Sequence, residues 1–130
     1  MEIWLARSHE NTREINMEHK MRLQPKYYEC ILNGTKRIEV RLNDEKRRLI
    51  NIGDTITFYK MPDEKESISV KVVDLLHYDS FEELLNDYDI SIVADKDDTK
   101  ENLIKILGEF YSKEEQDKYG ILGIKIDIIK

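Results

Sequence analysis

The sequence has 130 residues, of which 40% are hydrophobic and 37% charged, and its formal net charge is −6. This balance predicts one folded domain with an ion-rich surface and excludes an intrinsically disordered chain. One cysteine and the lack of any apolar run of ~20 residues exclude an intrachain disulfide and a membrane span, so we expect a soluble cytoplasmic protein without membrane contact.

A period-two pattern predicts the first strand over residues 15–23. One face of this strand carries Ile15, Met17, His19, Met21 and Leu23. His19 therefore has two interpretations, a hydrogen-bonded core histidine or a ligand-binding group, if that face lines a cleft. The weaker pattern before it predicts an N-terminal arm over residues 1–16, with the folded domain over 17–130.

A helix is predicted next, because Pro25 suits the first turn of a helix and Gly34 suits the left-handed residue that ends one. Its expected buried side carries Tyr28, Ile31 and Leu32. The chain then continues as a strand, in which Ile38 and Val40 lie on one face and Arg37, Glu39 and Arg41 on the other.

Two further strands are predicted over 55–60 and 67–78, and a last one over 121–129. Between them, Ser80, Thr99 and Ser112 are typical helix caps. The helix after Thr99 has an apolar stripe that ends at Phe110, and residues 90–100 are expected to form an acidic loop. Together these elements predict an α+β fold, a small mixed β-barrel of about five to six strands with short flanking helices.

The charges are unevenly distributed. Residues 20–60 hold ten Lys/Arg against five Asp/Glu, whereas residues 61–130 sum to −9. A basic third beside an acidic remainder favours a phosphate-bearing ligand on one face, although chance variation in a highly charged surface is the alternative. The three histidines show no metal-ligand spacing with each other or with Cys30, so neither a metal nor a cofactor is predicted.

Within this basic third, the stretch GTKRIEVRLNDEKRR (34–48) carries the chemistry. Glu39 and Arg41 lie two apart on a strand, so a fork of donors stands beside an acceptor, which suits a carboxylate, a phosphate or a base edge. The alternative is an exposed ion pair of little energy. The predicted ligand-binding residues are Lys36, Arg37, Glu39, Arg41, Lys46, Arg47, Arg48 and, from the first strand, His19.

The pattern Gly34-x-Lys36-x-x-Glu39-x-Arg41, with Gly53-Asp54 after it, resembles the signature of ASCH domains, a branch of the PUA-like superfamily. The resemblance extends over residues 17–128. It implies a PUA-like barrel in which the lysine, glutamate and arginine of the motif converge in a cleft, and a partner that is RNA or a (modified) nucleotide or nucleoside.

The resemblance also implies an alternative function, because some small bacterial members resemble amidohydrolases that act on acetylcytidine, and ribonuclease activity is attributed to the family. In this alternative Lys36 is a catalytic base or nucleophile and Glu39 handles protons. The amidohydrolases carry a threonine where this sequence has Glu39, and only Glu82 and Glu83 are candidates for their downstream glutamate. The sequence leaves open whether the protein is an enzyme, and its oligomeric state.

Overall fold

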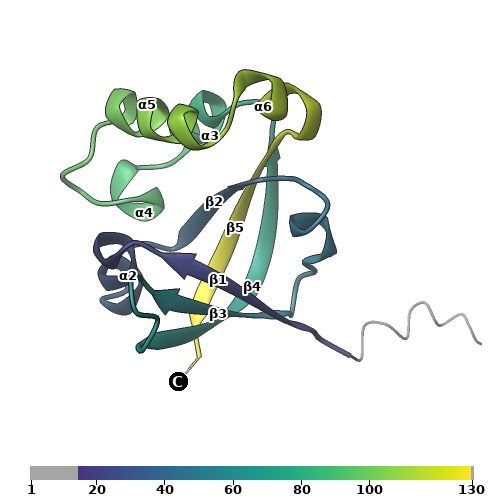
Figure 1. Cartoon of the computed structure of the whole chain (residues 1–130), viewed down its shortest axis with the longest axis vertical. Helices are drawn as coiled ribbons and strands as arrows, with labels where there is room; N and C mark the ends of the chain where they lie inside the picture. The colour runs from purple at the N-terminus through teal and green to yellow at the C-terminus, as the bar shows by residue number, and fades with distance from the viewer. Residues whose placement is uncertain (1–14, 130) are drawn as a thin grey trace, which may run out of the picture.

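The computed structural model describes residues 15–129, so the predicted arm, residues 1–16, lies almost wholly outside the described residues (Figure 1). The strands are β1 (Glu18–Leu23), β2 (Ile38–Leu42), β3 (Thr55–Lys60), β4 (Ser67–Tyr78) and β5 (Ile121–Ile128). The helices are α2 (Pro25–Leu32), α3 (Phe81–Asp87), α4 (Ile90–Val93), α5 (Lys100–Phe110) and α6 (Lys113–Tyr119), with a 3-10 turn, η2 (Arg47–Leu49). No helix among these residues is long and apolar enough to cross a membrane.

The strands form one curled sheet, a half-barrel, in the order β1-β3-β4-β5-β2 (Figure 1). The β1–β3 pair is parallel and the other pairs are antiparallel. A register shift between Val72 and Asp74 interrupts the β4–β5 pairing, the kind of irregularity that bends a long strand. Because β1 and β2 are the two edges, the half-barrel has an open seam between them. The predicted α+β barrel-like fold is confirmed.

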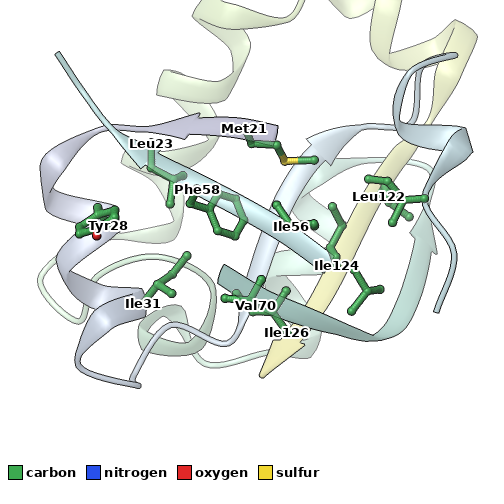
Figure 2. Packing of buried hydrophobic residues seen from close by; sticks show 12 residues of the cluster. Met21, Leu23, Tyr28, Ile31, Ile56, Phe58, Val70, Leu122, Ile124 and Ile126 are labelled. Carbon is green, nitrogen blue, oxygen red and sulfur yellow. The ribbon is translucent and has the colours of Figure 1, made fainter. Parts of the chain in front are cut away.

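Two apolar clusters fill the molecule. The first lies inside the curled sheet, where Ile56, Phe58 and Val70 are fully buried and α2 adds Tyr28 and Ile31 (Figure 2). The second lies between the sheet and the helices α3–α5, and its buried members are Leu42, Phe81, Leu84, Leu85, Val93, Ala94, Leu103 and Ile121. The alternation predicted for β3 and for the start of β4 is therefore confirmed.

Helix α3 approaches β5 at Gly123. A Cβ atom at that position would lie 2.9 Å from Leu84 Cδ1, which is closer than real Cβ atoms come. The lack of a side chain at Gly123 thus allows the helical layer to pack against the sheet. At Gly34 a glycine is favoured for its backbone conformation instead, because its φ of 89° lies in the left-handed region just after α2, as predicted.

Four apolar side chains that were expected in the core are exposed: Ile15, Met17, Leu32 and Phe110. Ile15 and Met17 precede Glu18, where pairing with β3 begins, so no neighbouring strand covers them. Leu32 lies at the margin of the face that α2 turns to the sheet, and Phe110 ends α5 beside a cleft described below. These positions show that periodicity identifies a face but not what covers it.

The acidic segment 90–100 was also predicted wrongly in part, because it contains α4. Asp89 caps this helix by accepting a hydrogen bond from the Ser91 amide, and Val93 is buried at its end. A four-residue helix is too short to give a periodic signal. The Asx cap was its only local indication.

Asp54 fixes the start of the parallel pair. Its Oδ1 accepts from the Met17 amide at 3.0 Å, and its Oδ2 accepts from the Asn51 amide at 2.9 Å and pairs with His19 Nε2 at 2.8 Å. Burial alone would raise the pKa of this carboxyl, but the hydrogen bonds from His19 and the two amides outweigh it and hold the pKa below its usual range. One carboxylate therefore joins the turn before β3 to β1.

We expect Asp54→Ala to lower the free energy of unfolding by about 3 kcal/mol, because it leaves two amides and an imidazole without their charged acceptor. Urea unfolding followed by circular dichroism measures this loss. Asp127→Ala, at an exposed position of β5, is the matched control and should leave the midpoint almost unchanged. Equal midpoints for the two variants would contradict the anchoring role.

Candidate functional site

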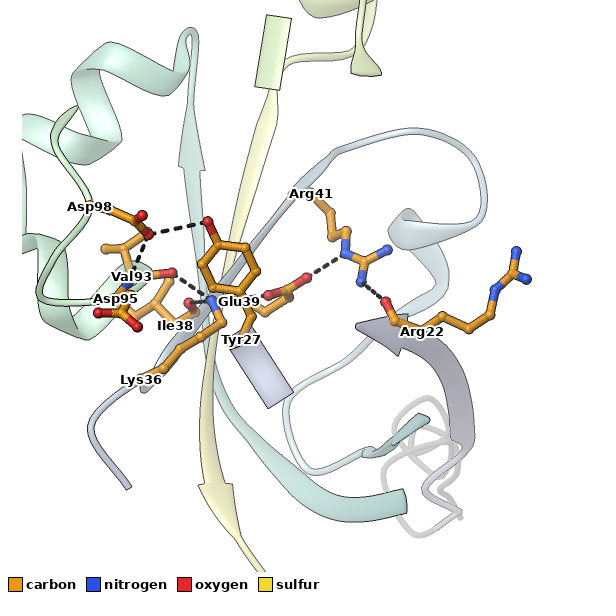
Figure 3. Close-up of polar contacts among 9 residues, drawn as sticks. All are labelled: Arg22, Tyr27, Lys36, Ile38, Glu39, Arg41, Val93, Asp95 and Asp98. Carbon is orange, nitrogen blue, oxygen red and sulfur yellow. Dashed lines mark hydrogen bonds and ion pairs between the residues drawn. The ribbon is translucent and has the colours of Figure 1, made fainter. Parts of the chain in front are cut away.

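Arg41 of β2 connects the two edges of the seam (Figure 3). Its Nη2 donates to the backbone carbonyl of Arg22 on β1 at 3.0 Å, and its Nε donates to Glu39 Oε2 at 2.6 Å. The two edge strands are therefore linked by a side chain where backbone pairing is missing. The guanidinium is held in a fixed orientation beside the seam.

Lys36 lies behind this pair and is almost completely buried. Its Nζ donates to the carbonyl oxygens of Ile38 and Val93, both at 2.6 Å, and contacts Glu39 Oε1 at 3.0 Å (Figure 3). A lysine ammonium has three hydrogens, so each has an acceptor within the protein. Lys36 thereby connects β2 to the end of α4 in the helical layer.

Glu39 stands between the two cations, with 8% of its side chain exposed. Burial alone would raise the pKa of its carboxyl, but the charges of Lys36 and Arg41 and their hydrogen bonds outweigh that effect and hold the pKa below its usual range. Glu39 is therefore a carboxylate at neutral pH, and an acceptor rather than a proton donor.

Glu39 and Arg41 line a cleft of about 520 Å³ between the seam and α5, which we call the central cleft. Its basic lining residues are Lys20, Arg22, Arg41, Lys46 and Arg47. Its acidic ones are Glu39 and Glu64. Aromatic and apolar residues complete it: Met21, Leu23, Tyr27, Val40, Tyr59, Met61, Leu103, Ile106, Leu107, Phe110 and Tyr111, with Gln24 between α2 and β1.

The central cleft thus has two unlike walls. The edge strands and the loop with η2 supply five cations and Glu39, and the β3–β4 connection adds Glu64. Helix α5 supplies Leu103, Ile106, Leu107 and Phe110. A ligand that carries both negative charge and a flat apolar face is complementary to such walls. The walls therefore suit a ligand of this mixed character better than a purely apolar or purely ionic one.

Of the predicted residues, the cleft brings together Glu39, Arg41, Lys46 and Arg47. Arg47 Nη1 is held by Asp44 Oδ2 at 3.2 Å, and its Nε is buried without a partner among the described residues. Lys36 touches the cleft only through Glu39.

The remaining three predicted residues lie elsewhere. Arg37 lines a separate cavity beside the end of β5, Arg48 donates from Nε to the Asn43 carbonyl and stands over the Tyr119 ring, and His19 pairs with Asp54. Arg37 precedes the first paired residue of β2, so strand alternation did not place its side chain. The described residues bring none of the three to the central cleft.

Several lining residues were not predicted from the sequence. Lys20 and Arg22 stand on the polar parity of the first strand, a signal that was present but is shared by any half-exposed strand. The stripe of α5 was expected in the core, where Leu103 does lie, but its members also line the cleft. Tyr27 lines the cleft as well, whereas Tyr28 is in the core as expected.

The other candidates belong to no such site. Glu83 Oε1 accepts from the Asp79 amide beside α3, and neither Glu82 nor Glu83 lines the central cleft. The buried Cys30 thiol faces Asp95 at 3.5 Å, and burial is the main cause that raises its pKa, which makes it a poor nucleophile. Within residues 15–129 no group of three or more His, Cys, Asp or Glu side chains is arranged to hold a metal ion.

Comparison with known proteins gives a consistent result. The sequence model of the ASCH domain family matches residues 21–130. The crystal structure of the hypothetical protein PH0355 is 40% identical, with a TM-score of 0.77 over 87% of this chain and 100% of that one. The solution structure of PF0455 from Pyrococcus furiosus is 36% identical, with a TM-score of 0.71 over 88% of this chain and 99% of that one.

A more distant structure shares the fold alone. ASCH from Zymomonas mobilis is 15% identical, with a TM-score of 0.59 over 85% of this chain and 66% of that one. No curated protein matches the chain.

We expect Lys36→Met to lower the free energy of unfolding by about 3 kcal/mol or more, because removing one member of a buried ion pair leaves its partner uncompensated. Thermal and urea unfolding measure the loss. Lys71→Met, at an exposed position of β4, is the matched control. A Lys36 variant as stable as this control would show that the buried ammonium does not hold the layers together.

Stability should also fall in acid. The pKa of Glu39 is lowered in the folded protein, whereas in the unfolded chain it has the ordinary glutamate value of about 4.3. Just below that pH the unfolded chain therefore binds a proton that the folded chain does not. The stabilisation is complete above the ordinary value and is lost as the pH falls through the folded value. Urea titrations between pH 7 and pH 3 should show a shallower decline for Glu39→Gln than for the natural protein. Parallel declines would contradict this assignment.

Proposed function

Because the chain belongs to the ASCH domain family, whose model matches residues 21–130, we propose that its central cleft binds RNA or a nucleotide. The observation that carries the proposal is the pairing of five cations with an aromatic and apolar wall in one cleft. Phosphates are bound by lysine and arginine, and bases stack on aromatic side chains. Both kinds of side chain, the cations and the aromatic residues, line the cleft at the seam of the half-barrel.

The contacts of Lys36 and Glu39 favour binding over hydrolysis. A nucleophilic lysine needs a neutral amine that faces the substrate, but all three hydrogens of Lys36 already have acceptors within the protein, the carbonyls of Ile38 and Val93 and the carboxylate of Glu39. A general base works best with a pKa near the operating pH, and that of the Glu39 carboxyl is lowered. In this arrangement Lys36 is a positioning residue, and Glu39 and Arg41 meet the ligand.

The charge distribution limits the ligand's size. The whole chain has a formal net charge of −6, and residues 61–130 sum to −9, so a long polyanion is repelled once it extends beyond the cleft. A short single strand or a single nucleotide fits this constraint, because its bases are unpaired and open to stacking. A duplex would offer phosphates but no free base face.

We expect a fluorescein-labelled single-stranded heptamer to bind with an affinity that falls as salt rises. The logarithm of Kd should increase with the logarithm of salt concentration with a slope of about 1 to 3, as expected for two to four phosphates of a single strand. The combined variant Lys20→Ala/Lys46→Ala, which removes two cleft cations, should weaken binding by about tenfold. Fluorescence anisotropy measures both effects.

The control removes two exposed cations that do not line the cleft, Lys113→Ala/Lys118→Ala on α6, and should bind as the natural protein does. Equal losses in the two double variants would show non-specific attraction and overturn the proposal. A second arm incubates acetylcytidine with the protein and with Lys36→Ala, followed by mass spectrometry. Deacetylation that Lys36→Ala abolishes would establish the amidohydrolase function in place of simple binding.

A further inference from the structure

We propose, on the basis of the proposed nucleic-acid function, that the central cleft selects an unpaired guanine, which Glu39 and Arg41 recognise at its Watson–Crick edge. The carboxylate would accept from the N1 and N2 hydrogens of the base. The guanidinium would donate to O6. The proposal goes beyond RNA binding, because it makes these two residues determinants of base identity.

The Glu39 carboxylate has hydrogen-bond acceptor positions that the protein contacts do not use, and it has no donor. Each carboxylate oxygen has room for two hydrogen bonds, and each has one partner among residues 15–129: Lys36 at Oε1 and Arg41 Nε at Oε2. By this count one acceptor position stays open on each oxygen. Because the charge stays on the group, it cannot present a proton to a ligand acceptor at neutral pH.

The Arg41 guanidinium has hydrogen-bond donors that the protein contacts do not use, and it has no acceptor. A guanidinium carries five N–H groups, of which one on Nε contacts Glu39 and one on Nη2 contacts Arg22 O. Three donors remain, two on Nη1 and one on Nη2, and 14% of the side chain is exposed. Because the guanidinium contacts the carboxylate directly and both residues line the cleft, a ligand there meets acceptors and donors on neighbouring side chains.

Guanine matches this pattern better than the other bases. Its Watson–Crick edge presents two adjacent N–H donors and then the O6 acceptor. Cytosine, adenine and uracil each present only one donor on that edge, so one open oxygen of a buried carboxylate would lose water without gaining a hydrogen bond. An unsatisfied buried group of this kind is costly, and such mismatches discriminate strongly between ligands.

The aromatic residues of the cleft are held in place before a base arrives. The Tyr27 hydroxyl donates to Asp98 Oδ2 at 3.1 Å, which also contacts the Asp95 amide (Figure 3). The Tyr111 ring stacks on Phe81 with 6.0 Å between centroids. Rings fixed by other contacts lose little freedom when a base packs on them.

The test compares heptamers UUUXUUU that differ only at X, so backbone contacts stay constant. We expect the probe with guanine to bind at least tenfold more tightly than those with adenine, cytosine or uracil, as a bidentate base contact would give. Inosine lacks the N2 amino group but keeps N1–H and O6. Replacing guanine with inosine should cost about three- to tenfold, the loss of one hydrogen bond to a charged acceptor.

Glu39→Gln should bind all five probes with nearly equal affinity, provided that circular dichroism shows it folded. The guanine–inosine comparison on the natural protein needs no variant, so it decides the question even if Glu39→Gln does not fold. Equal affinities for guanine and inosine, or a preference for another base, would overturn the guanine assignment while RNA binding stands. Failure of every heptamer to bind would overturn the proposed function as well.

Discussion

The buried carboxylate of Glu39 is the contact on which the rest of the arrangement depends. A lone carboxylate at this depth would lose several kcal/mol of hydration, and only two cations in direct contact make its burial tolerable. Those cations also reach outward, Lys36 to the end of α4 and Arg41 to the backbone of β1. One negative charge therefore determines where the helical layer and the two sheet edges meet.

If the cleft binds its ligand as proposed, this arrangement combines stability and recognition in the same atoms. All three hydrogens of the Lys36 ammonium are directed to acceptors within the protein, and its contact with Glu39 keeps that carboxylate ionised and oriented without any ligand. Arg41 is restrained by Glu39 and by Arg22 O, so its free donors have a fixed direction. A ligand then meets groups that need not reorganise, and this lowers the entropy cost of binding. A substitution in the motif consequently changes folding and binding together.

The sequence predicted the order of elements well, because local signals produced them. Alternation placed Ile56 and Phe58 in the core, and Gly34 marked the end of α2. The motif was recognised, but the contact between Lys36 and Val93 was not predicted, since Val93 lies 57 residues away on a helix with no periodic signal. The stripe of α5 was only partly understood, because Leu103 is in the core as expected but Phe110 is exposed beside the cleft. An amphipathic stripe such as that of α5 has the same pattern whether a core or a cleft lies opposite it.

The link between Arg41 and the carbonyl of Arg22 has a consequence for solubility as well. Exposed sheet edges offer unpaired backbone groups to other chains and so invite edge-to-edge association. Here both free edges face one seam. The Arg41 guanidinium donates a hydrogen bond to one backbone carbonyl of β1, and the other cations of the cleft lie beside the edge strands. Positive charge along an edge strand is a common natural deterrent to strand addition. The cations that would hold a phosphate in the proposed function therefore also oppose pairing with a second copy of the sheet.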